Sequence, residues 1–228
     1  MKSTPDNLEV LHEDNHLIIV NKKPGDIVQG DKTGDKPLSE VVKQYLKTKH
    51  GKPGNVFLGV VHRLDRPTSG AVIFARTSKA LSRMNEQIKN REIKKTYWAI
   101  VKGKPEEKGS LIHYLKKNPK NNKSTAYSKE TPGAKKAVLH YNTLGNSDKY
   151  SLLEIDLETG RHHQIRTQLS KIGYPIKGDL KYGFPRSNPD KGISLHAKKL
   201  SFTHPVSKKK IEVEAPVPSN DLWKFFKK

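Results

Sequence analysis

One carboxylate in the sequence is surrounded by basic side chains where an apolar run ends. Asp65 has His62, Arg63 and Arg66 within three residues, and a Pro/Gly-containing turn at 67–70 follows it. An aspartate beside arginine stays ionised at neutral pH, so it can act as a nucleophile or base without further activation. Loops at strand ends commonly display catalytic groups. On spacing alone, however, the favoured interpretation is an Asx-type turn in which Asp65 caps backbone amides.

A second candidate is an arginine at the margin of a predicted apolar helix face. Arg166 follows Ile165 and precedes Leu169 by three residues, in a segment that opens with Thr159-Gly160. Burying an arginine there is costly unless a carboxylate meets it, and Asp65 is a natural partner. The alternative is that Arg166 extends over the apolar stripe into solvent.

A third candidate is an aromatic residue beside a basic cluster. If 96–101 is a strand, Tyr97, Ala99 and Val101 share one face and Trp98 and Ile100 the other. An aromatic ring in that position can stack on a nucleobase. Unaided by other evidence, the favoured interpretation is a core tyrosine with its hydroxyl at the rim.

Two patterns that resemble metal sites lack the necessary context. His12-Glu13-Asp14-Asn15-His16 matches H-E-x-x-H, but it spans a predicted turn between two β-prone segments rather than a helix. His162 and His163 are adjacent on a predicted helix and therefore point in different directions. The sequence contains neither a phosphate-binding P-loop nor a G-x-G-x-x-G fingerprint. We therefore expect no metal and no nucleotide cofactor.

The elements that must position these residues are short and numerous. A hairpin is predicted from 8–12 and 17–21, with further strands at 71–75, 96–101, 111–115, 125–128, 138–144, 150–157, 194–202 and 211–215. Helices are predicted after a cap at Asp35, after Thr77 or Ser78, from Thr159-Gly160 to Gly173, and around Trp223. The polar run 116–123 is predicted to be a mobile loop. Many strands and few helices indicate an α+β fold on a largely antiparallel mixed sheet.

Composition narrows the class of partner. The 228 residues contain 44 Lys and Arg but only 23 Asp and Glu, which gives a net charge of +21. Such a charge attracts polyanions, nucleic acid first and anionic membrane second, although solubilising lysines are the plain alternative. With no cysteine, thiolate chemistry and disulfides are excluded. The absence of a signal-like start or an apolar span indicates a soluble, cytoplasmic protein.

Five stretches in order resemble the RluA-type RNA pseudouridine synthases, over about residues 8–217. They are Asn21-Lys22-Lys23-Pro24-Gly25, His62-Arg63-Leu64-Asp65 with Thr68-Ser69-Gly70, the K-x-Y-x-A-x-V-x-G strand at 95–103, T-G-R-x-H-Q-I-R at 159–166, and Leu195-His196-Ala197 with His204-Pro205. The resemblance implies the pseudouridine-synthase fold and isomerisation of uridine to pseudouridine in ribosomal or transfer RNA. It overturns the structural interpretations of Asp65, Arg166 and Tyr97 given above.

The resemblance also implies roles for particular residues. Asp65 is expected to be the nucleophile or charge stabiliser, Arg166 to pair with it, and Tyr97 to contact the target base and assist proton removal at C5. Substrate contacts are expected from a further set: His62, Arg63, Arg161 and Leu195. The arginine at 63 is similar to one that fills the space left by a flipped base. Neither cofactor nor metal is required.

Two departures from the family pattern bear on substrate choice. His162 occupies a position where the family usually has a small hydroxyl residue. An S4-like RNA-binding module does not precede the catalytic region in this sequence, so we expect one catalytic domain over 1–228. RNA selection then rests on that domain, with the 116–123 loop as a candidate contact. A monomer is expected, without a membrane or an obligate protein partner.

Two other functions compete with this interpretation. A noncatalytic RNA-binding or RNA-folding protein could use the same fold, but binding alone needs no desolvated acid–arginine pair. A glycosidase would need two carboxylates beside a sugar bond. Glu154 and Asp156 are the nearest candidates, on a strand with no evident pocket.

Overall fold

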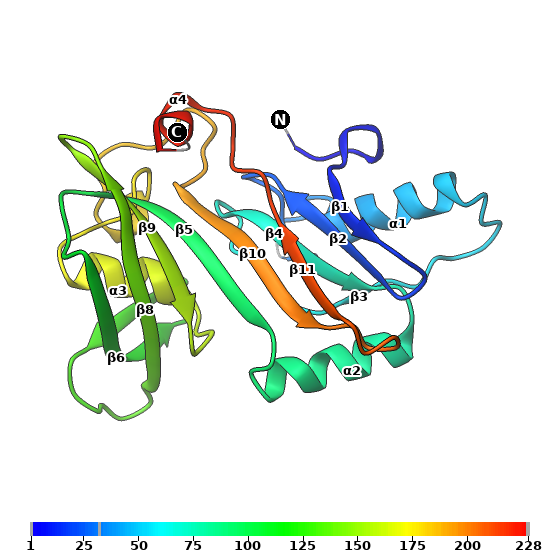
Figure 1. The fold of residues 1–228 in the computed structure, drawn as a ribbon, viewed down its shortest axis with the longest axis horizontal. Coiled ribbons are helices and arrows are strands. Elements are labelled where there is room, and N and C mark those ends of the chain that lie inside the picture. Colours follow the sequence, from blue (N-terminus) through cyan, green and yellow to red (C-terminus); the bar gives the residue numbers. More distant parts are fainter. Residues whose placement is uncertain (1, 32, 227–228) are drawn as a thin grey trace. The chain divides into compact units, whose positions relative to one another are not determined.

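The computed structural model describes residues 2–31 and 33–226. The chain divides into two compact units: residues 1–95 with 197–218, and residues 96–196 with 219–228. It passes from the first to the second within strand β5 (Lys94–Lys102) and returns within strand β10 (Leu195–Thr203). Most of the helices and strands of both units are labelled in Figure 1.

The first unit is built around strands in the order β1–β2–β4–β10. In addition, β3 pairs with β4 and β11 pairs with β10, both antiparallel. Its remaining bounds are η1 Pro5–Asn7, β1 Val10–Glu13, β2 Leu17–Lys22, α1 Leu38–Lys49, β3 Gly59–Val60, β4 Ser69–Ala75, α2 Ser78–Lys89 and β11 Lys210–Glu214. Central strand β2 pairs antiparallel with β1 on one side and β4 on the other.

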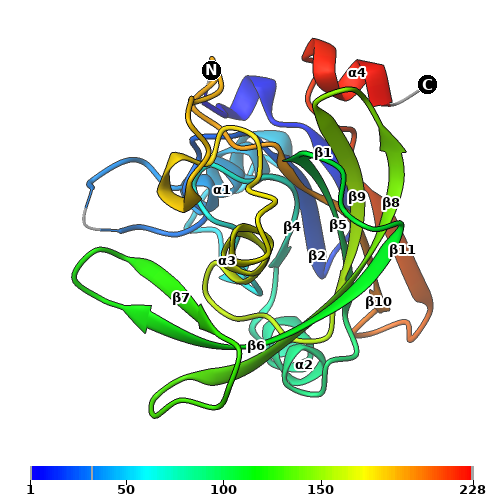
Figure 2. The ribbon, with the colours of Figure 1, turned by 90° about the vertical axis from the view of Figure 1, so that its left-hand side faces the viewer.

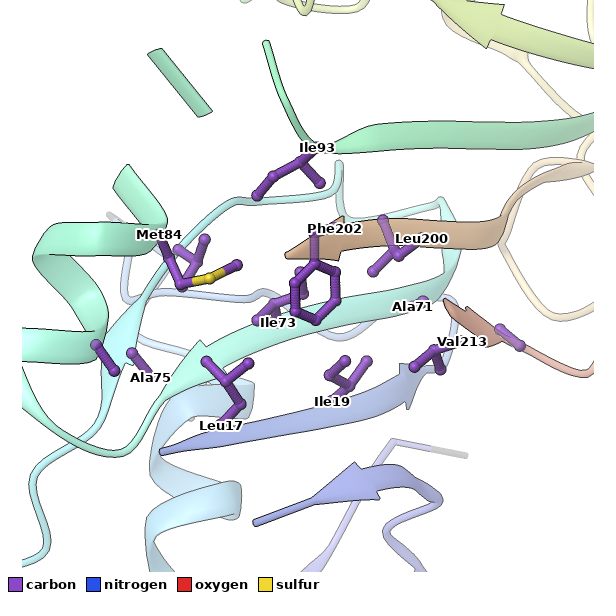
Figure 3. Close-up of a cluster of buried hydrophobic side chains, with 13 residues drawn as sticks. Leu17, Ile19, Ala71, Ile73, Ala75, Met84, Ile93, Leu200, Phe202 and Val213 are labelled. Carbon is purple, nitrogen blue, oxygen red and sulfur yellow. The ribbon is translucent and has the colours of Figure 1, made fainter. Parts of the chain in front are cut away.

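A hydrophobic cluster holds the first unit together. Leu17 and Ile19 of β2 lie with Ile73 of β4, Met84 of α2 and Phe202 of β10 (Figure 3), and all five side chains are buried. Burying each side chain of this size contributes roughly 1.5–3 kcal/mol to stability. The strands on either side of the Asp65 turn are therefore anchored in a well-packed core.

The second unit contains the strand order β5–β9–β8–β6–β7, with antiparallel pairs from β5 through to β7. Its remaining bounds are β6 Lys108–Asn118, β7 Lys123–Tyr127, β8 Lys135–Asn146, β9 Tyr150–Leu157, α3 Gln164–Lys171, η2 Leu180–Tyr182 and α4 Asp221–Phe226. Helix α3 lies beside β6 and β7 (Figure 2). The amide of Gln168 ties α3 to the strands by donating to the carbonyl of Leu111 at 3.0 Å.

The observed elements confirm the α+β prediction and most of the predicted segments. The hairpin of β1 and β2, the cap of α2 by Thr77, the hairpin of β8 and β9 and the terminal helix all form as predicted. No helix in the described part of the chain is long and apolar enough to cross a membrane. The expectation of a single catalytic domain stays a prediction.

Three predicted boundaries are wrong. Asp35 does not cap α1, whose N-cap is Pro37, because the Asp35 carboxylate is held by Arg66 and Lys2. Half of the predicted loop 116–123 is strand, because β6 and β7 continue to pair up to Asn118 and Lys123, and the turn covers 119–122. Helix α3 begins at Gln164 and not near Gly160.

Candidate active site

Asp65 begins a tight turn between β3 and β4. The backbone N–H of Thr68 donates to the carbonyl of Asp65 at 3.0 Å, which closes the turn 65–68. Pro67 suits the turn because its ring fixes φ and it has no N–H to satisfy. Asp65 is partly exposed, whereas Thr68 is buried. The turn therefore exposes the carboxylate of Asp65 while its other end is buried.

A buried lysine clamps the backbone of this turn. The Nζ of Lys22 donates to three carbonyl oxygens: Thr68 at 2.6 Å, Arg66 at 3.0 Å and Lys23 at 3.1 Å. These three bonds use the full donor capacity of an ammonium group. Burial lowers the pKa of Lys22 to about 7, against the attraction of Asp26 and Asp65. A cation that is expensive to bury thus spans the carbonyls of the turn that carries Asp65.

A second clamp acts on the side chain of the same turn. The guanidinium of Arg66 binds the carboxylate of Asp35 and donates to the hydroxyl of Thr33 at 2.7 Å. Hydrogen bonds from Lys2 and Arg66 hold the pKa of Asp35 down at about 2. Arg66 therefore joins the turn to the loop before α1, and its charge is already matched by carboxylates.

The residues on either side of the turn are fixed as well. The Nε2 of His62 accepts the backbone N–H of Ile73 at 3.2 Å, so the ring hydrogen of a neutral His62 is on Nδ1. Burial and the nearby charge of Lys95 lower the pKa of His62 to about 3. Gly70 has a φ of 114°, and a Cβ there would lie 2.5 Å from the backbone nitrogen of Ala197. Only glycine fits where β4 runs so close to β10.

Arg166, in the second unit, is buried against a carboxylate that the sequence did not suggest. Its Nε donates to Asp179 at 2.7 Å and its Nη2 donates to the other carboxylate oxygen at 2.8 Å. Arg166 and Asp179 are 4% and 1% exposed, and the guanidinium lies 5.0 Å from the ring centre of Tyr182. The prediction that Arg166 does not extend to solvent is confirmed. Its predicted pairing with Asp65 joins residues of different units and stays a prediction.

The two adjacent histidines do not lie on a helix. Both precede α3, and His163 takes a left-handed conformation with φ of 54°. Their rings stack with centroids 3.8 Å apart, so the prediction that they point in different directions is wrong. Because His163 is left-handed, the side-chain directions of a regular helix do not apply to this pair.

The remaining predicted site residues are placed as follows. Tyr97 is buried on β5, opposite Ile155 of β9. Leu195 is buried at the start of β10. Arg161 is partly exposed just before α3, and its Nε donates to the carbonyl of Lys136 at 3.0 Å. Arg63 is exposed beside the turn. The first unit thus gathers His62, Arg63 and Asp65, and the second carries the other four.

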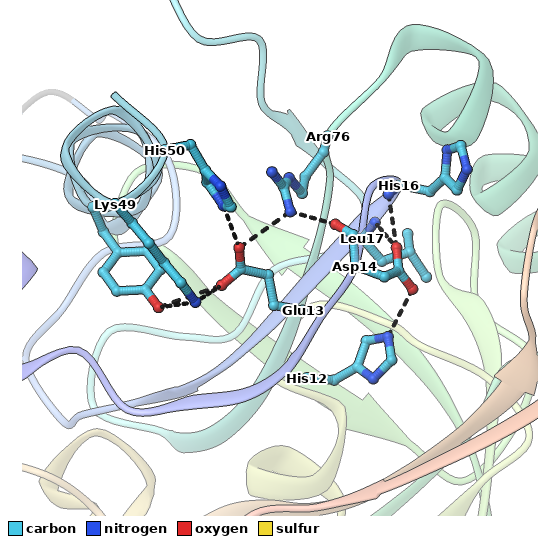
Figure 4. Close-up of polar contacts among 9 residues, drawn as sticks. His12, Glu13, Asp14, His16, Leu17, Lys49, His50 and Arg76 are labelled. Atoms are coloured by element: carbon cyan, nitrogen blue, oxygen red, sulfur yellow. Dashed lines mark hydrogen bonds and ion pairs between the residues drawn. The ribbon is translucent and has the colours of Figure 1, made fainter. Parts of the chain in front are cut away.

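The H-E-x-x-H match forms an ion-pair network at the turn between β1 and β2 (Figure 4). Glu13 accepts bonds from Lys49 at 2.8 Å and His50 at 2.7 Å, and Asp14 binds the Nε2 of His12 at 2.8 Å. Burial opposes ionisation of Glu13, but the bonds from Lys49 and His50 outweigh it and lower its pKa. The predicted β-turn context is confirmed. Among the described residues, no group of three or more potential ligands could hold a metal.

Comparison with known proteins identifies the family. The family model described as RNA pseudouridylate synthase matches residues 16–171. An uncharacterized RNA pseudouridine synthase of Synechocystis is 36% identical over 93% of this chain and 66% of its own length. A ribosomal large subunit pseudouridine synthase D of Zymomonas mobilis is 34% identical over 96% of this chain and 72% of its own length. The chain spans about two thirds to three quarters of these relatives.

Solved structures support the same fold. Human RNA pseudouridylate synthase domain containing 4 superposes with a TM-score of 0.77 at 24% identity, covering 92% of this chain and 89% of that one. Human RNA pseudouridylate synthase domain containing 1 gives 0.78 at 23% identity, covering 99% and 90%. The chain belongs to the RNA pseudouridylate synthase family. By class it is an isomerase that modifies RNA.

Sequence reasoning missed three residues that shape the site: Lys22, Asp179 and Tyr182. Each left a signal. Lys22 ends a strand, Leu17–Lys22, whose first four residues are apolar, and a charged side chain there needs a partner if it is buried. Asp179 is the one carboxylate between Glu158 and Asp190, and it follows a glycine with positive φ. Neither signal identifies the partner, because the bonded groups lie 13 to 46 residues away.

Proposed function

We propose that this chain converts specific uridines of ribosomal or transfer RNA into pseudouridine. The N1–C1′ bond breaks, the base turns, C5 bonds to C1′, C5 loses its proton and N1 gains one. The observation that carries the proposal is the Asp65 turn, which presents a partly exposed carboxylate and is clamped by Lys22 and Arg66. The name of the Zymomonas relative favours ribosomal RNA as the substrate.

Asp65 is the proposed catalytic residue. An ionised carboxylate on a rigid turn can attack C1′ of the sugar, attack the base, or stabilise charge on a glycal route. All three routes need the carboxylate held in one position, since misplacement by about 1 Å costs rate steeply. The clamps on the backbone and on Arg66 provide that rigidity.

The second unit supplies the other proposed groups. Tyr97 would contact the target base and assist removal of the C5 proton, and Leu195 would form an apolar wall. Arg166 would pair with Asp65. Its bidentate bond to Asp179 already fixes the guanidinium plane, which supports a positioning role.

Reaction at C1′ requires the uridine to leave the base stack. Enzymes that act on a base offset a few kcal/mol of unstacking with contacts in the pocket. Arg63 would fill the vacated space, and His62 and Arg161 would contact the substrate. The ring of His62 would act as a neutral Nδ1 donor, because its pKa of about 3 excludes a cation at physiological pH. The chemistry needs neither metal nor cofactor, and a cytoplasmic monomer would suffice.

Tritium release from RNA labelled at uridine C5 tests the proposal, because isomerisation replaces that hydrogen. Wild-type protein, Asp65→Asn and Asp148→Asn are incubated with labelled ribosomal RNA and with labelled transfer RNA. The third protein is the matched control, since Asp148 is an exposed aspartate in the turn between β8 and β9. Release by the wild type and the control but not by Asp65→Asn is expected.

The noncatalytic alternative makes a different prediction in the same assay. A protein that only binds or folds RNA would retain labelled RNA on a filter and release no tritium from any complete RNA pool. Full turnover by Asp65→Asn would instead keep the enzyme and remove Asp65 from its mechanism.

A further inference from the structure

The β6–β7 hairpin of the second unit concentrates positive charge. Between Glu107 and Glu130 the sequence contains six lysines and no acidic residue. Four lysines at the far end of the hairpin are exposed, namely Lys116, Lys117, Lys120 and Lys123. None of the ion pairs among the described residues involves these four lysines. A pair of strands that leaves its charges unmatched fits a polyanionic partner.

Polar groups at the hairpin tip have the same donor character. Asn118 Oδ1 accepts the backbone N–H of Lys120 at 2.9 Å, and Asn121 Oδ1 accepts that of Lys123 at 3.1 Å. Both amides are thereby oriented, and each retains its NH₂ group as a donor. The tip therefore presents ammonium and amide donors together, which suits phosphate oxygens.

A buried serine next to the turn fixes the far end of the hairpin. Ser124 is 2% exposed, and its backbone N–H donates to the hydroxyl of Tyr182 at 2.8 Å. Its Oγ donates to the carbonyl of His162 at 2.8 Å and lies 2.8 Å from His162 Nδ1. Because the serine hydrogen is used at the carbonyl, Nδ1 must carry the hydrogen of the second bond. One serine thus joins β7 to the backbone and the ring of His162.

The same network reaches the segment before α3. His162 stacks on His163, and the Nδ1 of His163 lies 2.8 Å from the hydroxyl of Tyr182. Lys123 lies over the Tyr182 ring at 5.3 Å, and Arg166 lies near that ring at 5.0 Å. The far end of the hairpin and the residues around Arg166 therefore share one packed set of rings.

We propose that the β6–β7 hairpin binds the phosphate backbone of RNA and that His162 is the residue that positions it. This inference deepens the proposed function, on which its choice of RNA rests. A hairpin fixed in place loses less conformational freedom on binding than a mobile loop, so more of its contact energy appears as affinity. His162, which departs from the family pattern, contributes to this positioning because its ring binds the hydroxyl of Ser124.

Charge removal tests the binding surface. One variant carries glutamine at positions 116, 117, 120 and 123. The matched control replaces four exposed lysines of the first unit, Lys79, Lys89, Lys208 and Lys209, with glutamine. Binding of a fluorescent poly(U) oligonucleotide is measured over a series of salt concentrations. Each lost phosphate contact lowers the log–log salt slope by about 0.7, so the hairpin variant should lose about 2–3 in slope.

The control should lose a clearly smaller part of the slope. Equal losses of salt slope in the two variants would overturn the proposal, because RNA binding would then depend on net charge and not on the position of the lysines. Since poly(U) binding needs no turnover, this outcome is separate from the tritium assay. A wild type that shows the hairpin effect but never releases tritium would retain the binding surface and refute the proposed enzyme.

Substitution at 162 tests the positioning role. Asparagine can place an amide N–H where the imidazole has Nδ1, whereas alanine cannot. We expect His162→Ala to weaken poly(U) binding about fivefold and His162→Asn to restore most of it. In the background of the four glutamines, His162→Ala should have no further effect. Additive effects, or no rescue by asparagine in a folded protein, would overturn the role, because His162 would then act on RNA directly or only on folding.

Discussion

The ammonium group of Lys22 donates a 2.6 Å hydrogen bond to the backbone carbonyl oxygen of Thr68. Thr68 closes the turn that Asp65 opens, so a buried cation at the end of β2 bears directly on the position of the proposed catalytic carboxylate. The same ammonium also binds the carbonyl of Arg66. The position of the Asp65 turn thus depends on the charge state and reach of one side chain.

Lys22→Met should damage both stability and turnover. Methionine fills the space but removes the Lys22 donor from the carbonyl of Thr68, at about 1–3 kcal/mol for a buried group, whereas the carbonyl of Arg66 keeps the bond from the backbone N–H of Gly25. Because removing a buried charge offsets part of this cost, we expect a net loss of about 2 kcal/mol in the free energy of unfolding. We also expect at least a tenfold fall in the rate of tritium release at saturating RNA.

The neighbouring lysine provides the control for that experiment. Lys23 is partly exposed and binds Asn7 through its Nζ. Lys23→Met should change the free energy of unfolding by less than about 1 kcal/mol, as a surface substitution does. Similar losses for the two methionine variants, measured by urea unfolding, would refute a special role for the buried ammonium.

The protonation of Lys22 should make stability and activity respond to pH in opposite directions. The unfolded chain keeps this proton up to its usual pKa of 10.5, whereas the folded protein releases it near 7. Between these values the unfolded state binds more protons, so the Lys22 contribution to stability rises with pH. A neutral amine has only two N–H donors for three carbonyls, so the clamp weakens and turnover should fall above pH 7.

Comparison of wild type with Lys22→Met isolates this effect from other titrating groups. Asp26, Asp65 and Arg66 are the charged groups that act on Lys22, and all three remain in the variant. From pH 7 to 9 the wild type should gain stability relative to the variant in urea unfolding. Single-turnover tritium release should decline with pH in the wild type alone. Parallel pH profiles in the two proteins would contradict the assignment.

Gly70→Ala should prevent the turn from joining β4 correctly. The position has a φ of 114°, and the added methyl group would lie 2.5 Å from the backbone nitrogen of Ala197. Backbone strain of this kind costs on the order of 1–3 kcal/mol, and the clash with a neighbouring strand adds to it. We expect a loss of more than about 3 kcal/mol in thermal or urea unfolding. Gly54→Ala meets no atom within 4 Å and should be nearly neutral.

Asp179→Asn should reveal how much Arg166 depends on its buried carboxylate. Both groups are almost fully buried, and removing one charge of such a pair costs about 3–5 kcal/mol when the other is left uncompensated, so the proposed pairing of Arg166 with Asp65 should reduce the loss. Urea unfolding checks the loss, with Asp148→Asn as the exposed control. If Asp179→Asn were as stable as the control, Arg166 would have to draw its stabilisation from another group.

Much of the local structure was readable from the sequence. The alternating segments around Gly145 and Asp148 predicted the hairpin of β8 and β9, and of the two predicted caps for α2, Thr77 or Ser78, the structure has Thr77. These features depend on periodicity and turn chemistry within a few residues. The H-E-x-x-H match was excluded as a helical motif for the same local reason.

The sequence by itself determined the family motifs, the positive charge and the position of Asp65 at the end of an apolar run. Only the tertiary structure decided which groups form hydrogen bonds and ion pairs with the buried polar residues. It gave Arg166 the carboxylate of Asp179, placed Lys22 under the turn, and linked Ser124 to His162. These partners lie from 13 to 46 residues apart along the chain, so no local pattern encodes them. They meet because buried charges and donors must be satisfied wherever the packing of strands and helices brings a partner within reach.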